Sequence, residues 1–262
     1  MRAPRLRRRK AGPRLRRGIY LLPSLFTVAN IFFGFLSVIS ATRGQMARAA
    51  ILILVANVAD ILDGRIARLT GSTSGFGEIY DSIADVISFG LAPALLAYQW
   101  GLWQVPRAGI AVAFLFLVAG SIRLARFSST PHDTHTFVGL PIPAGSSAIA
   151  LLVLLRPAPV QHAAFIPVVA GFVFCVAVLM VSNLPYASFK DVNLRRQWPA
   201  TTLFIIALAF SLITLTPHVL SVLLAIYILS APLKVLARMV RGRSAGAASP
   251  HTQGSSDDSV DA

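Results

Sequence analysis

Long apolar runs alternate with short polar stretches from residue 20 to residue 237. A run of about 20 apolar residues, at about 1.5 Å per residue in a helix, is long enough to cross a bilayer. The pattern therefore predicts an all-α fold, a polytopic membrane helix bundle with about eight transmembrane helices. They are expected near residues 20–41, 46–69, 78–98, 107–127, 143–156, 163–182, 200–215 and 218–237.

Polar tails flank the predicted membrane domain, which we place at residues 19–240. Residues 1–18 carry nine Lys and Arg, and residues 241–262 are rich in Ser, Gly, Ala and Asp. We expect both tails to be disordered and the basic one to lie near anionic lipid headgroups. The first apolar run is longer than the core of a signal peptide, usually about 7–15 residues, so we expect it to be a retained span.

The composition supports the membrane prediction, with 55% hydrophobic residues and a net charge of +14. In a soluble protein such an excess of basic residues would suggest nucleic acid. Here the hydropathy argues against a nucleic-acid partner, and the basic residues indicate topology. If both termini are cytoplasmic, all but four of the 24 Lys and Arg residues lie at the inner face. The four outer ones would be Arg43, Arg48, Arg107 and Arg156.

Two smaller features also fit a membrane bundle. The single cysteine, Cys175, lies in an apolar run, where it cannot form an intramolecular disulfide and is expected to be buried. Tyr98, Trp100 and Trp103 are expected to form an aromatic belt at the outer interface.

Five of the ten acidic residues lie between residues 60 and 85. Asp60 and Asp63 are three residues apart, and Asp81 and Asp85 are four apart, so each pair lies on one helix face. In an antiparallel helix pair, all four carboxylates would share one depth, roughly 4–14 Å from the inner helix ends. Carboxylates at membrane depth are costly and are usually functional.

Four carboxylates so close together need a neutralising charge. Arg65 and Arg68 could supply it, but two arginines on one helix match four acids on two helices poorly. A set of oxygen ligands without Cys or His suits Mg²⁺, Mn²⁺ or Ca²⁺. We therefore predict a divalent-metal site. Its ligands would be Asp60, Asp63, Asp81 and Asp85.

These acids form the pattern D-x2-D-G-x2-A-R-x8-G-x3-D-x3-D, which begins at Asp60 and ends at Asp85. The pattern resembles the signature of the CDP-alcohol phosphatidyltransferase family, and every position matches. Within the family, roughly the first 145 residues are most similar to the bacterial and archaeal phosphatidylserine synthases. That narrower resemblance rests on residues 21–30, 81–93, 123–127 and 139–144.

The resemblance implies an enzyme with a six-helix catalytic core, acting as a homodimer in the cell (inner) membrane with its active site at the cytoplasmic face. It would transfer the phosphatidyl group of CDP-diacylglycerol to the hydroxyl of L-serine, which gives phosphatidylserine and CMP. It would use two divalent cations, Mg²⁺ or Mn²⁺, held by the four aspartates. Asp81 would bridge the ions, and Asp85 would be the catalytic base.

Small and basic residues beside the acids are candidates for substrate binding. Gly64 and Ala67 are small residues that would allow close approach to the first acidic helix, and Gly77 would leave room for the nucleotide. Arg68 can pair with a phosphate oxygen.

Further candidates lie on other spans. Arg123 and Arg126 could bind the carboxylate of serine or a phosphate, or could be topological anchors. Thr27, Asn30 and Asn57 could bind substrate or could form hydrogen bonds between helices.

Three other functions remain open on the sequence. The same chemistry could use glycerol 3-phosphate or inositol phosphate as the acceptor. The acids could instead form the ion path of a divalent-cation transporter, although such a path should carry polar groups on both sides of the bilayer centre. A structural scaffold would leave the acids unexplained.

Overall fold

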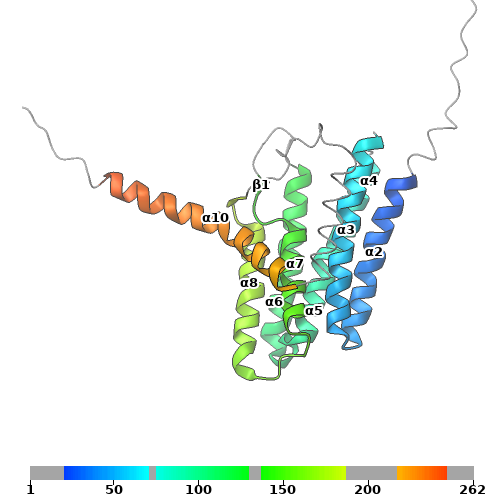
Figure 1. Ribbon diagram of the computed structural model, residues 1–262, viewed down its shortest axis with the longest axis horizontal. Coiled ribbons are helices and arrows are strands. Elements are labelled where there is room, and N and C mark those ends of the chain that lie inside the picture. The colour runs from blue at the N-terminus through cyan, green and yellow to red at the C-terminus, as the bar shows by residue number, and fades with distance from the viewer. Residues whose placement is uncertain (1–20, 71–74, 130–136, 187–216, 247–262) are drawn as a thin grey trace, which may run out of the picture.

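The computed structural model describes residues 21–70, 75–129, 137–186 and 217–246. Figure 1 shows an upright bundle of helices from which the last helix extends to one side. Within these described ranges, four helices are long and apolar enough to cross a membrane. They are Leu25–Thr42, Gly75–Trp100, Pro106–Ser128 and Ala163–Val181.

The described elements are almost entirely helical. The α-helices are α2 (Leu21–Thr42), α3 (Met46–Thr70), α4 (Gly75–Asp85), α5 (Ala92–Trp100), α6 (Pro106–Ser129), α7 (Ile142–Leu155), α8 (Ile166–Val181) and α10 (Pro217–Gly246). The π-helical turn η1 (Val86–Leu91) joins α4 to α5, and the 3-10 turns are η2 (Leu102–Gln104) and η3 (Ala163–Phe165). Two short antiparallel strands, β1 (Phe137–Val138) and β2 (Pro185–Tyr186), are the exception to the all-α prediction.

The predicted segments agree with the helices within a few residues, except that α10 runs well past the predicted end at residue 237 and that the segment at 200–215 lies outside the described residues. Helix α3 is 25 residues long, but its charged side chains keep it out of the four helices that are apolar enough to cross a membrane. Helix α10 continues to Gly246 and thus includes residues 241–246, which we had assigned to the polar tail. The count of eight spans and the cytoplasmic termini stay predictions.

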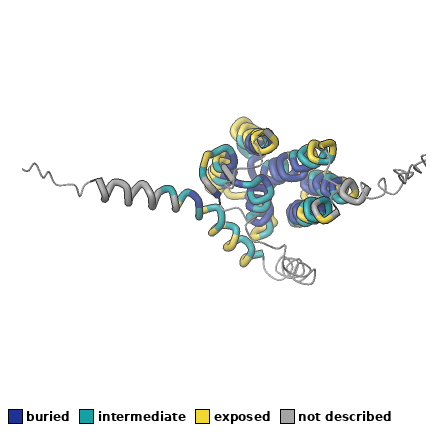
Figure 2. The backbone as a smooth tube through the Cα atoms, turned by 90° about the horizontal axis from the view of Figure 1, so that it is seen from above, coloured by how far each residue is buried: buried dark blue, intermediate teal, exposed yellow. Residues whose placement is uncertain are grey.

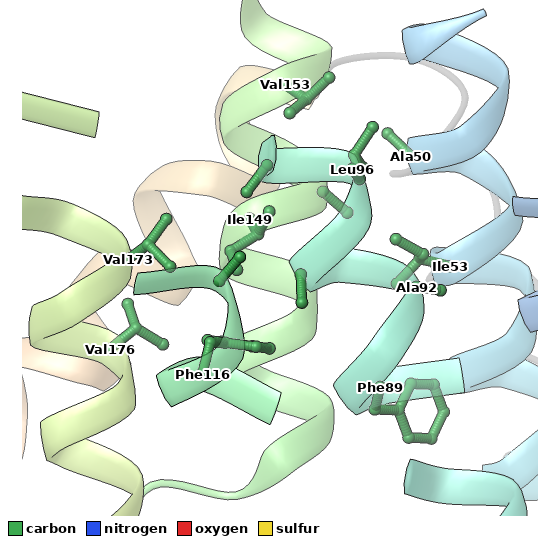
Figure 3. Close-up of a cluster of buried hydrophobic side chains, with 14 of the residues drawn as sticks. Ala50, Ile53, Phe89, Ala92, Leu96, Phe116, Ile149, Val153, Val173 and Val176 are labelled. Carbon is green, nitrogen blue, oxygen red and sulfur yellow. The ribbon is translucent and has the colours of Figure 1, made fainter. Parts of the chain in front are cut away.

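Helix α5 lies at the centre of the apolar core. Figure 3 shows Ala92 and Leu96 of this helix between Ile53 of α3 and Ile149 of α7, and α5 packs against both neighbouring helices. Several buried residues of α3 are alanines, and their small side chains allow α3 and α5 to pack closely. These are Ala49, Ala50, Ala56 and Ala59.

The outward faces of the bundle are apolar. Figure 2 shows the buried positions inside the bundle and the exposed ones on its outer surface. Large apolar side chains such as Phe32 (54% exposed) and Phe114 (63% exposed) lie on this surface. Because many exposed apolar side chains are unfavourable in water and suited to lipid, and four described helices are long and apolar enough to cross a membrane, we conclude that this is a membrane protein.

Two side chains lie differently from their predictions. Trp100 is buried, and its indole N–H donates to the carbonyl oxygens of Arg156 (3.0 Å) and Ala158 (3.1 Å), so it is a packing residue and not part of an exposed belt. Cys175 is exposed, because α8 turns a different face, with Val173 and Val176, into the core.

Candidate active site

The acidic residues of α3 and α4 meet in space. One carboxylate oxygen from each of Asp60, Asp81 and Asp85 lies within 4.8 Å of the others. Asp85 is buried, and Asp60 and Asp81 are half-buried. The acids from two helices thus converge as the helical spacing predicts, although their role as metal ligands stays a prediction.

Asp63 occupies a neighbouring position and is not one of the three converging acids. It is buried, and its Oδ2 accepts a hydrogen bond from the hydroxyl of Thr27 on α2. Its charge still acts on Asp60 and Asp81, so it adds to the negative potential of the cluster.

The acidic cluster has the properties of a divalent-cation site. Two buried oxygens of the four acids, Oδ1 of Asp63 and Oδ1 of Asp81, have no hydrogen-bond partner among the described residues. Buried charged oxygens without partners are costly, and a cation would satisfy them. The ligand atoms are all carboxylate oxygens, which suit hard ions such as Mg²⁺ or Mn²⁺. The residues therefore fit a metal of this class.

Helix α2 supports the cluster through two hydrogen bonds. Thr27 donates to Asp63, and Nδ2 of Asn30 donates to Oδ1 of Asp85 at 3.3 Å. Thr27 and Asn30 are three residues apart and therefore lie on one face of α2. The sequence left open whether Thr27 and Asn30 bind substrate or form hydrogen bonds between helices. The structure shows hydrogen bonds between helices, and their acceptors are the acids themselves.

Asn57 links α3 to α7. Its Nδ2 donates to the hydroxyl oxygens of Ser146 (3.4 Å) and Ser147 (3.1 Å), in addition to the carbonyl oxygen of Ile53 (3.4 Å) in its own helix. This is the interhelical hydrogen bond that the sequence allowed. It holds α7 against α3 one turn before Asp60.

The two candidate arginines on α6 have different surroundings. Arg123 is buried, its Nε has no hydrogen-bond partner among the described residues, and its charge acts on Asp85 and on Tyr227 of α10. Arg126 is exposed and donates to the carbonyl oxygen of Val181 at 2.9 Å. Arg123 therefore faces the acidic residues and Arg126 joins α6 to the end of α8, while a role of either arginine in binding substrate stays a prediction.

The remaining predicted residues follow the acids along the two helices. Gly64 and Ala67 lie on α3, each one turn after an acid, and Gly77 lies in the first turn of α4. Arg68 is in the last turns of α3, and its side chain lies outside the described part of the chain. The substrate contacts of these four residues stay predictions.

Sequence reasoning did not find Tyr227 or Ser88. Tyr227 packs against Tyr186 in a tilted ring pair with centroids 5.6 Å apart and interacts electrostatically with Arg123; it lies on the last helix, where no motif marks it. Ser88 is fully buried in η1 and donates to the carbonyl oxygen of Asn30 at 2.9 Å. Its position three residues after Asp85 is the one signal that could have indicated it.

The fold and the site define a membrane-embedded protein with an acidic centre at a helix pair, and comparison with known families gives its class. A family model described as CDP-alcohol phosphatidyltransferase matches residues 20–181. The chain therefore belongs to the CDP-alcohol phosphatidyltransferase family and is a transferase.

Individual relatives are similar along most of the chain. The CDP-diacylglycerol–serine O-phosphatidyltransferase of Helicobacter pylori is 38% identical over 227 residues, which cover 85% of this chain and 94% of the relative. The archaetidylserine synthase of Methanothermobacter thermautotrophicus is 38% identical over 167 residues, 63% of this chain and 69% of the relative. The Bacillus subtilis CDP-diacylglycerol–serine O-phosphatidyltransferase is 29% identical over 170 residues, which cover 64% of this chain and 91% of the relative.

Proposed function

We propose that the protein transfers the phosphatidyl group of CDP-diacylglycerol to the hydroxyl of L-serine, giving phosphatidylserine and CMP. The observation that carries this proposal is the convergence of three carboxylates from α3 and α4 within 4.8 Å, inside a family whose members transfer such groups. Serine as the acceptor is supported by the names of the relatives, of which several are serine phosphatidyltransferases.

The cluster would hold two divalent cations, Mg²⁺ or Mn²⁺. Asp60, Asp63, Asp81 and Asp85 would be the residues that hold them. When bound, the cations supply charge neutralisation for the diphosphate of the lipid and for the departing CMP. Gly64, Ala67 and Gly77 would leave space for the nucleotide, and Arg68 would pair with a phosphate oxygen.

Asp85 would act as the general base. Its Oδ1 accepts a hydrogen bond from Asn30, which fixes the carboxylate and leaves its other oxygen to take a proton. The serine oxygen attacks the phosphorus that carries diacylglycerol, and its proton passes to Asp85. The bond from this phosphorus to the oxygen shared with CMP breaks, and CMP leaves with that oxygen.

Arg123 would bind the carboxylate of serine. A guanidinium that is buried beside Asp85 and has an N–H without a described partner is suited to an anionic group of the acceptor. The serine carboxylate would then lie on the α6 side of the acids, with its hydroxyl towards Asp85. A phosphate of another acceptor could use the same arginine, so the acceptor must be tested directly.

The site would open at the cytoplasmic face of the inner membrane. CDP-diacylglycerol would keep its acyl chains in the bilayer, while serine and CMP exchange with the cytosol and anionic headgroups contact the basic residues of that face. The homodimer that the family resemblance implies is also part of this proposal, and chemical cross-linking of the purified protein would test it.

The acceptor assay tests the proposal. Purified protein is given CDP-diacylglycerol and Mn²⁺ with radiolabelled serine, glycerol 3-phosphate or inositol phosphate in parallel. We expect CMP release and lipid label with serine alone. Label entering lipid from glycerol 3-phosphate and not from serine would contradict the choice of acceptor, and Mn²⁺ uptake into proteoliposomes without CMP release would contradict the reaction itself.

A further inference from the structure

The helix that carries Asp81 and Asp85 changes its form directly after Asp85. The segment Val86–Leu91 is a π-helical turn, in which the backbone N–H of Ala92 donates to the carbonyl oxygen of Ile87. Such turns are rare and occur frequently at functional sites. Three consecutive residues of this turn are buried, so the wide turn faces the inside of the bundle. They are Ser88, Phe89 and Gly90.

The π-helical turn is in direct contact with α2. The hydroxyl of Ser88 donates to the carbonyl oxygen of Asn30 at 2.9 Å, and both side chains are fully buried. A Cβ atom at Gly34 would lie 2.3 Å from Oγ and 2.8 Å from Cα of Ser88. Contacts this short are not sterically possible, so α2 can approach the turn only with a glycine at this position.

Asn30 is held at both its backbone and its side chain. Its carbonyl oxygen accepts from Ser88, and its Nδ2 donates to Asp85 at 3.3 Å. Since Asp85 and Ser88 lie three residues apart on one helix, the two bonds join Asn30 to adjacent points of the same helix face. The bonds form a closed loop, in which a shift of Ser88 would move Asn30 and with it the Asp85 carboxylate.

We propose that Ser88 and Gly34 are positioning residues that fix the Asp85 carboxylate, acting through Asn30. In the part of the chain that the structure describes, the Ser88 hydroxyl bonds to Asn30 and to none of the acids, and Gly34 acts by allowing the close approach of α2. The inference rests on the proposed function, because the orientation of Asp85 matters there for holding the cation and for accepting the proton. Removing a group that hydrogen-bonds to a metal ligand, and so orients it, typically lowers metal affinity or activity by about 10–100-fold.

The test compares two buried serines that each bond a neighbouring segment. Ser88→Ala removes the bond to Asn30, and the control Ser37→Ala removes the bond from Ser37 to the carbonyl oxygen of Ala49 (2.8 Å), which joins α2 to α3. Mn²⁺ affinity of the purified protein is measured without substrate by electron paramagnetic resonance of free Mn²⁺, and kcat and KM are measured separately. We expect Ser88→Ala to weaken Mn²⁺ binding and lower kcat about tenfold, with KM for serine unchanged.

A glycine pair gives a second measurement. Gly34→Ala would push the turn away from α2 and should reduce Mn²⁺ affinity at least as much as Ser88→Ala. The control Gly171→Ala has no atom within 4 Å of the added Cβ and should bind Mn²⁺ like the wild type. If Gly34→Ala does not fold, the comparison of Ser88→Ala with Ser37→Ala still tests the positioning role.

The outcomes separate this inference from the function on which it rests. Equal Mn²⁺ affinity and kcat in Ser88→Ala and Ser37→Ala, with normal binding by the wild type, would overturn the positioning role alone. A wild-type protein that binds no Mn²⁺ would overturn the proposed metal site and this inference with it.

Discussion

The side chain of Asn30 on α2 donates a hydrogen bond of 3.3 Å to the carboxylate of Asp85 at the end of α4. Both residues are buried, and Oδ1 of Asn30 has no partner among the described residues. The signature acids lie on α3 and α4 alone, yet α2 orients one of them. Helix α2 is therefore a part of the acidic site in addition to α3 and α4, and substitutions on α2 should affect it.

Replacing Asn30 with leucine should impair turnover without preventing folding. Leucine is similar in size but cannot donate to Asp85, so the carboxylate loses its fixed orientation. We expect kcat to fall about tenfold and KM for CDP-diacylglycerol to change little. The control is Ser40→Ala on the same helix, where the hydroxyl bonds only to the carbonyl oxygen of Leu36. Equal kcat in the two variants would contradict a role for this hydrogen bond.

Asp85→Asn should abolish turnover and retain binding of the lipid substrate. An amide cannot accept the proton of the serine hydroxyl, so we expect a loss of kcat of about 100-fold or more. Lipid binding in the presence of Mn²⁺, measured by calorimetry, should persist. Glu78→Gln is a matched control, because Glu78 is exposed in the first turn of the same helix. Turnover in Asp85→Asn equal to that of the control would exclude this base.

Chelation should stop the reaction. With excess EDTA we expect CMP release to fall to background, and addition of Mg²⁺ or Mn²⁺ should restore it, because the clustered carboxylates need a cation to hold the diphosphate. Zn²⁺ should restore it poorly, since the cluster contains no Cys or His among its ligands. Full activity in EDTA would rule out a metal-dependent reaction.

Arg123→Gln should raise KM for serine more than KM for CDP-diacylglycerol. Loss of a charged hydrogen bond to the serine carboxylate should weaken binding about tenfold or more. The control is Arg126→Gln, since Arg126 is exposed and bonds to the backbone of Val181. A change in KM for CDP-diacylglycerol alone would assign Arg123 to a phosphate of the lipid.

The hydropathy pattern was sufficient to predict most of the fold. A helix that must cross lipid needs a long apolar run, and the runs at 20–41 and 107–127 agree with α2 and α6 within a few residues. The convergence of Asp60, Asp81 and Asp85 was also predictable, because helical spacing and an antiparallel helix pair together determine it.

Other features depend on packing that no local pattern records. The π-helical turn after Asp85 leaves the hydrophobic run unbroken, so its sequence predicts an ordinary helix. Trp100 is buried because the loop after α7 supplies two carbonyl oxygens for its indole N–H. Tyr227 comes near enough to interact electrostatically with Arg123 because α10 packs against α7, a contact between segments far apart in the chain.

The most direct test of the account is the position of Mn²⁺ in crystals of the protein grown with this ion. The account predicts anomalous difference density between α3 and α4, within bonding distance of the carboxylates of Asp60, Asp81 and Asp85. Anomalous density that lies away from these three carboxylates would contradict the account. So would the absence of anomalous density in crystals from a preparation that is active with Mn²⁺.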